Sequence, residues 1–181
     1  MRSKIHSYSI IAFCSAIIAV LAQITIPLPL VPITGQSLAI GLIATILPLQ
    51  LSMSAVTLYI LIGALGIPVY ANFTGGIGIL FGPTGGFLFS FILTASFISY
   101  YLSKSTFTFF HCFIANIIGM LINLTLGSIW LKYYLDIDFK SAFVSGFVAF
   151  LLVGVIKAFL ASWAGIQIKN RLQKAKLLAF K

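Results

Sequence analysis

The chain has 181 residues, of which 61% are hydrophobic and only 7% are charged. Soluble domains carry about 25% charged residues, so this composition excludes a soluble globular protein and favours a bundle of membrane-spanning helices. The formal net charge of +9 gathers near the two ends of the chain, where basic residues mark membrane topology rather than a nucleic-acid surface. We therefore expect an all-α integral membrane protein, with residues 1–181 forming a single transmembrane domain and no nucleic acid among its partners.

Six apolar segments follow one another along the sequence, separated by prolines, glycines or short polar stretches. The second segment is short for a hydrocarbon core about 30 Å thick, which needs about 20 helical residues. We nevertheless interpret all six segments as transmembrane helices. Their expected ranges are 5–26, 35–47, 49–65, 84–102, 107–131 and 142–168.

The distribution of basic residues predicts the orientation of these helices. An even number of spans puts both termini on one side, which also carries Lys104 and most of the basic residues of the chain. The other side has Lys132 and Lys140, offset by two aspartates. The positive-inside rule then places both termini in the cytoplasm. The proline-rich connection after the first span and the glycine-rich connection after the third are expected to face outward.

Residues 66–86 hold 7 of the 15 glycines of the chain. Glycine at this density permits turns and left-handed backbone. At membrane depth, such irregular backbone is tolerated only where it is buried in protein or lines a cavity. We therefore expect a ligand site here, with amide, aromatic and backbone contacts, although each residue alone could be structural. The candidates are Tyr70, Asn72, Phe73, Gly75 and Gly76.

The sequence Pro83-Thr84-Gly85-Gly86 opens the fourth predicted span. Thr84 is a suitable N-cap residue, and the first-turn N–H groups together with the helix dipole favour an acceptor such as a carboxylate or a carbonyl. The alternative is an ordinary capped helix start after a loop. The nearby glycines favour a cavity wall, so we add Thr84, Gly85 and Gly86 to the candidate ligand contacts.

Lys157 is a charged residue midway along the sixth predicted span. The next basic residue, Lys169, lies 12 positions further on, or about 18 Å along a helix, so the side chain cannot reach the cytoplasmic interface. A charge at the bilayer centre costs at least ~2.5–3.5 kcal/mol and usually faces the bundle interior. Lys157 is therefore predicted to contact an anionic or strongly polar group of a ligand. If the span is misplaced, it would instead lie near the outer interface.

Other residue types restrict the mechanism. The sequence has no glutamate, and its two carboxylates, Asp136 and Asp138, lie in a connecting loop, which leaves no intramembrane carboxylate for a proton relay. There is no phosphate-binding loop for ATP, no metal-ligand spacing of cysteines and no catalytic set, so neither an enzyme nor a metal site is expected.

Asn116 and Asn123 share one face of the fifth span, where they could join helices or line the cavity.

Three segments resemble the BioY family, the biotin-specific substrate-binding (S) components of energy-coupling-factor (ECF) transporters. They are QITIPLPLVPITGQSL (residues 23–38), LYILIGALGIPVYA (58–71) and GGIGILFGPTGGF (75–87). The resemblance implies a six-helix S-component bundle in the bacterial cytoplasmic membrane that captures biotin from outside without a cofactor. It also implies a transmembrane coupling subunit and two cytoplasmic ATPase subunits as partners.

The first span contains a small-xxx-small pattern, Ala12 and Ala16, of the kind that lets helices approach closely in lipid. By chance alone, alanines often fall at this spacing in membrane helices. The resemblance implies that these two alanines dock on the coupling subunit.

The sequence departs from the BioY pattern at one position. The family commonly carries an aspartate three residues before the lysine of the sixth helix, whereas this chain has Gly154 before Lys157. The lysine therefore lacks that partner. Either the carboxylate of the ligand supplies the missing negative charge, or the lysine is partly neutral in the membrane. Two other functions stay open: a stand-alone facilitator of biotin or another small metabolite without ATPase coupling, and a purely structural membrane protein.

Overall fold

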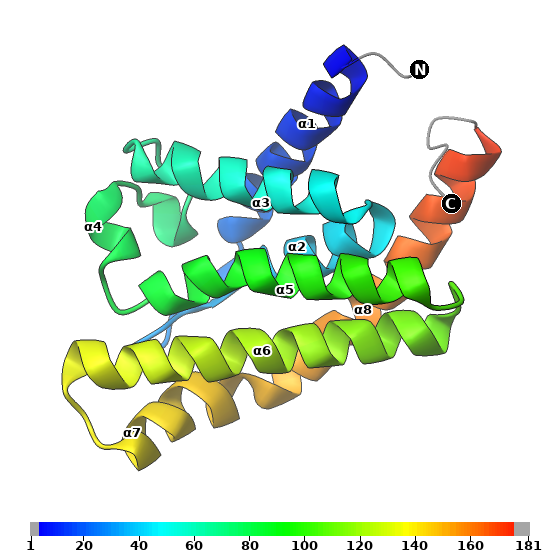
Figure 1. Ribbon diagram of the computed structural model, residues 1–181. Helices are drawn as coiled ribbons and strands as arrows, with labels where there is room; N and C mark the ends of the chain where they lie inside the picture. Colours follow the sequence, from blue (N-terminus) through cyan, green and yellow to red (C-terminus); the bar gives the residue numbers. More distant parts are fainter. Residues whose placement is uncertain (1–3, 176–181) are drawn as a thin grey trace.

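The computed structural model describes residues 4–175 and consists of helices joined by short connections (Figure 1). The predicted topology also used Arg2 and two C-terminal lysines, Lys176 and Lys181, which lie outside the described residues. The long helices are α1 (Lys4–Ala22), α2 (Gln36–Ile46), α3 (Leu49–Ala64), α5 (Gly85–Lys104), α6 (Phe109–Leu135) and α8 (Ala149–Lys174). The short elements are β1 (Thr25–Ile26), β2 (Ile33–Thr34), η1 (Ala71–Phe73), α4 (Ile77–Leu80), α7 (Phe139–Phe143) and the π-helical turn η2 (Val144–Val148).

Among the described residues, four helical segments are long and apolar enough to cross a membrane. They are Lys4–Ala22, Gly85–Lys104, Phe109–Leu135 and Phe139–Lys174, the last of which runs continuously through α7, η2 and α8. The helices α2 and α3 are also apolar but shorter. The helical membrane-protein class is therefore confirmed, whereas the number of six spans stays a prediction.

Four expected boundaries lie three to six residues from the observed ones: the ends of the first, fifth and sixth spans and the start of the sixth. Two of these differences have a clear cause in the hydrogen bonding of the chain. The first span was expected to reach residue 26, but α1 ends at Ala22 because Thr25 and Ile26 pair with Thr34 and Ile33 in a short antiparallel hairpin. The last span was expected to begin at residue 142. It begins three residues earlier because the Asp138 side chain accepts a hydrogen bond from the Ser141 N–H (3.0 Å) and caps α7.

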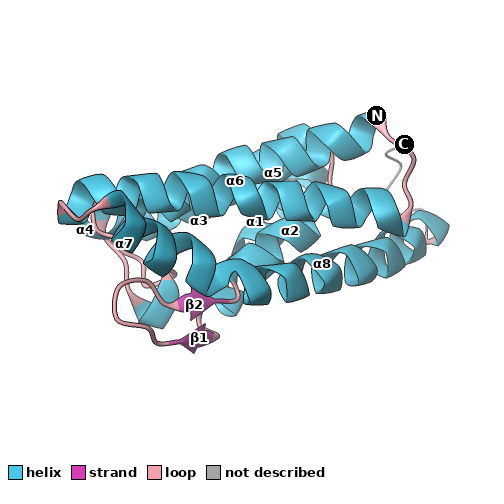
Figure 2. Ribbon diagram, turned by 90° about the horizontal axis from the view of Figure 1, so that it is seen from below, coloured by secondary structure: helices cyan, strands magenta, loops and turns pink. Residues whose placement is uncertain are grey.

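The helices α5 and α6 pack side by side along most of their length (Figure 1). The main apolar core lies between α1, α2, α3, α5 and the start of α6. The helix α8 packs against α2 and α6, and α1 packs against α3 and α2. The start of α1 and the end of α8 lie at the same end of the bundle, opposite α4 and the hairpin, in both ribbon views (Figures 1 and 2).

Buried amides join the helices of this bundle. The Asn116 amide donates to Thr45 Oγ1 (2.9 Å) on α2 and to Ser162 Oγ (3.2 Å) on α8. The Asn123 amide donates to the Phe87 carbonyl (3.0 Å) and to Ser90 Oγ (2.6 Å) on α5. A buried amide without a partner would cost about 1–3 kcal/mol, so these bonds restrict how α6 can pack against its neighbours.

Candidate functional site

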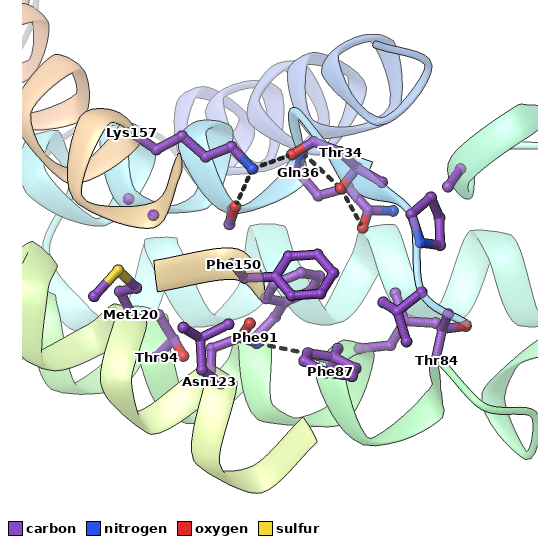
Figure 3. A pocket seen from close by; sticks show the side chains of 18 of the residues that line it. Thr34, Gln36, Thr84, Phe87, Phe91, Thr94, Met120, Asn123, Phe150 and Lys157 are labelled. Atoms are coloured by element: carbon purple, nitrogen blue, oxygen red, sulfur yellow. Dashed lines mark hydrogen bonds between the residues drawn. The ribbon is translucent and has the colours of Figure 1, made fainter. Parts of the chain in front are cut away.

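A cavity of about 310 Å³ lies between α2, α5, α6 and α8, and the hairpin and the glycine-rich segment contribute to its wall (Figure 3). Its apolar surface combines aromatic rings, among them Phe87, Phe91 and Phe150, with aliphatic side chains. Its polar groups are hydroxyls, amides and one ammonium. This combination of an apolar wall and a few convergent polar groups is typical of a small-molecule site.

Lys157 supplies the ammonium group. Its Nζ donates a hydrogen bond to the Thr34 carbonyl (2.6 Å) on β2 and another to Ser37 Oγ (3.1 Å) at the start of α2. Figure 3 shows both bonds reaching from α8 across to the hairpin side of the cavity. Within residues 4–175 no carboxylate lies in ion-pair distance of Lys157, because the two aspartates are in the loop before α7 and at its start. The lysine therefore presents a positive charge that only neutral oxygens solvate.

Tyr70 and Asn72 belong to the glycine-rich segment and also line the cavity. Tyr70 is buried, its hydroxyl donates to the Ile60 carbonyl (2.6 Å), and its ring meets that of Tyr59 edge-on at 5.6 Å between centroids. Asn72 has left-handed backbone (φ 57°), and its Oδ1 accepts a hydrogen bond from Thr25 Oγ1 (2.7 Å). The segment is thus tied to α3 on one side and to the hairpin on the other.

The other three candidates from this segment do not line the cavity. Phe73 points outward, with 72% of its side chain exposed. A Cβ on Gly75 would collide with the Ile67 carbonyl, and Gly76 has a positive φ of 103°. These two glycines therefore shape the loop and do not themselves line the cavity.

At the start of α5, Thr84 lines the cavity, whereas Gly85 and Gly86 do not. The Thr84 side chain makes no capping hydrogen bond. The N–H groups of Gly85 and Phe87 already donate to the carbonyls of Gly82 and Thr84, so this helix start has fewer free donors than expected. A Cβ on Gly86 would collide with Trp130, which shows that this glycine allows α5 to pack closely against α6.

Several lining residues were not among the sequence candidates. Thr34, Gln36 and Ser37 follow the proline-rich connection, and the Gln36 amide donates to the Tyr59 hydroxyl (2.6 Å). Their polar side chains at the start of an apolar span were a usable signal. The aromatic rings and Met120 offered none, since such residues are spread over the whole sequence.

Ala12 and Ala16 lie away from the cavity, on an exposed face of α1. Ile5, Tyr8 and Val20 are also more than half exposed on this helix. Neither alanine is therefore needed to pack the core of the bundle.

The fold is that of a helical membrane protein whose helices surround a cavity with the features of a small-molecule site. Residues 1–174 match the model of the BioY family. The chain belongs to the BioY family.

Individual relatives cover nearly the whole chain. It is 42% identical to the biotin transporter BioY2 of Lactococcus lactis subsp. cremoris, over 92% of each chain. It is 39% identical to the biotin transporter BioY of Thermotoga maritima, over 86% of this chain and 91% of the relative. The fold is similar to a crystal structure of the S-component for biotin from an ECF-type ABC transporter, with a TM-score of 0.84 and 26% identity over 94% of this chain and 92% of that one.

Proposed function

We propose that this chain binds biotin and serves its uptake as the S component of an ECF-type transporter. The observation that carries this proposal is an apolar, aromatic cavity with one ammonium group, in a chain similar over most of its length to biotin transporters. Biotin combines an apolar sulfur-containing ring, a ureido group and a carboxylate. The aromatic rings of the cavity match the apolar ring of biotin, and the amides and hydroxyls match its ureido group. Lys157 matches an anionic or strongly polar group of the ligand.

The contacts of the site follow from the positions of its residues. Lys157 supplies charge, Asn72 and Thr84 supply polar atoms, and Tyr70 covers part of the apolar surface. Phe73, Gly75, Gly76, Gly85 and Gly86 act indirectly in this proposal, by shaping the two segments that carry the contacts.

The proposal includes a six-span arrangement in the bacterial cytoplasmic membrane. The two described chain ends lie at the same end of the bundle (Figures 1 and 2), which supports placing both termini in the cytoplasm. The hairpin and the glycine-rich segment then face outward, where biotin enters. The partners are a transmembrane coupling subunit, which contacts Ala12 and Ala16, and two cytoplasmic ATPase subunits.

Isothermal titration of the detergent-purified chain with biotin tests the ligand. We expect saturable binding of one biotin per chain, and no binding down to micromolar concentrations would remove the assignment. Reconstitution into vesicles without ATPase or coupling subunits tests the mechanism. Net biotin entry into such vesicles would favour a stand-alone facilitator instead.

A further inference from the structure

Gly154 and Met120 contact each other in the wall of the cavity. Gly154 lies on α8, three residues before Lys157, and Met120 lies on α6; both line the cavity. A Cβ built on Gly154 would collide with Met120 Sδ and would lie 3.0 Å from its Cγ. The thioether of Met120 therefore occupies the space that any side chain at position 154 would need.

We propose that Met120 is a specificity-determining residue of this cavity. Its side chain forms a neutral, deformable part of the wall beside Lys157 and fills the space that a side chain at position 154 would need. This inference rests on the proposed function, because it concerns how the same cavity fits biotin.

The chemistry of the thioether supports this role. Methionine has three rotatable bonds and a polarisable sulfur, so it fits irregular apolar surfaces and packs well against rings. Met120 is partly buried and packs against the apolar cluster that includes Phe87, Leu124 and Phe150. Figure 3 shows it projecting from α6 toward the turn of α8 that precedes Lys157. An apolar group of the ligand would therefore meet the sulfur, while Lys157 stays free for an acceptor.

The contact also explains why an added side chain at position 154 would change the cavity rather than the helix. Alanine is favoured over glycine inside a helix by about 1 kcal/mol, so the α8 backbone tolerates Gly154→Ala. The flexible Met120 side chain can turn away from the new methyl group, but it then enters the cavity. The cavity becomes smaller and the fold stays intact.

A double-mutant cycle of Gly154→Ala and Met120→Ala, with biotin titration and melting temperatures, tests the inference. Gly154→Ala alone should weaken biotin binding by about 10-fold, the effect of moderate overpacking, without lowering the melting temperature. In the Met120→Ala background, the same substitution should leave biotin affinity unchanged or improve it. Gly78→Ala is the matched control, because a Cβ there meets nothing within 4 Å.

Two results would contradict the inference in a chain that binds biotin. One is a Gly154→Ala variant that binds biotin with wild-type affinity. The other is a loss of biotin affinity on Gly154→Ala that is equally large in the wild-type and the Met120→Ala backgrounds. A wild-type chain that does not bind biotin would instead overturn the proposed function, and the inference with it. The wild-type titration therefore separates the two failures.

Discussion

Of the 26 described residues that line the cavity, Lys157 carries the charge, and its position is costly. A lysine within a membrane-spanning helix costs at least ~2.5–3.5 kcal/mol, and among residues 4–175 its ammonium donates to the Thr34 carbonyl and the Ser37 hydroxyl, both neutral groups. A carboxylate brought by a ligand would add a negative charge, which no described residue places near this ammonium. The residue is thus better suited to binding than to stability.

Lys157→Met tests this assignment. The substitution keeps the apolar stem and removes the charge, so biotin affinity should fall by about 10- to 100-fold, the effect of losing a charged hydrogen bond. The melting temperature should stay the same or rise, because an unpaired charge leaves the bundle. Both quantities can be measured by titration and thermal unfolding in detergent.

The exposed Lys104 provides a matched control, since Lys104→Met removes a charge outside the cavity. Biotin methyl ester identifies the group that Lys157 contacts. If it is the carboxylate, the substitution should weaken binding of biotin more than binding of the ester. Unchanged biotin affinity in Lys157→Met would place the lysine outside the site.

At the scale of elements, Gln23 links the end of α1 to the glycine-rich segment. Its amide nitrogen donates to the carbonyls of Val69 (3.3 Å) and Tyr70 (3.1 Å), and its carbonyl oxygen accepts from the N–H of Phe73 (2.8 Å). Asn72 and Phe73 both have left-handed backbone, with φ of 57° and 55°, a conformation that costs energy in residues other than glycine. One side chain thus holds a strained part of the cavity wall.

Gln23→Ala should therefore weaken biotin binding although Gln23 does not line the cavity. With each lost hydrogen bond worth about 1 kcal/mol, we expect biotin affinity to fall by about 10-fold. The loop would open more often, so dissociation, measured by stopped flow, should accelerate more than association slows. The exposed Gln50 gives the control Gln50→Ala. If biotin dissociates from Gln23→Ala at the wild-type rate, the other contacts suffice to hold the loop.

At the scale of the whole molecule, binding and uptake should depend on different surfaces. The cavity lies between α2, α5, α6 and α8, whereas Ala12 and Ala16 lie on the exposed face of α1. A close helix–helix contact in lipid needs small residues, so bulky side chains on this face should block a partner without disturbing the cavity.

The double substitution Ala12→Trp and Ala16→Trp should reduce biotin uptake by cells to background. Biotin affinity in detergent should stay within about twofold of wild type, because exposed positions tolerate substitution with little change in stability. Leu152→Trp is the control, since Leu152 is 74% exposed on α8. If the double variant loses biotin binding as well, the two alanines pack the protein itself and not a partner.

Composition and local pattern were enough to assign the membrane class, the approximate positions of the helices and part of the wall of the cavity. Apolar length, glycine density and one charge in an apolar segment are properties of neighbouring residues, and each has a direct physical consequence in lipid. They led to Lys157, Tyr70, Asn72 and Thr84, which the structure brings to one cavity.

Only the tertiary structure decided which distant residues meet. The early end of α1 depends on strand pairing across the hairpin, and Gln23 reaches partners 46 to 50 positions away. The contact between Met120 and Gly154 joins two helices, and no local pattern in the sequence pairs this methionine with this glycine. The sequence therefore predicted a cavity with an intramembrane lysine in a membrane bundle, while packing between helices determined the shape of that cavity, because shape depends on non-local contacts.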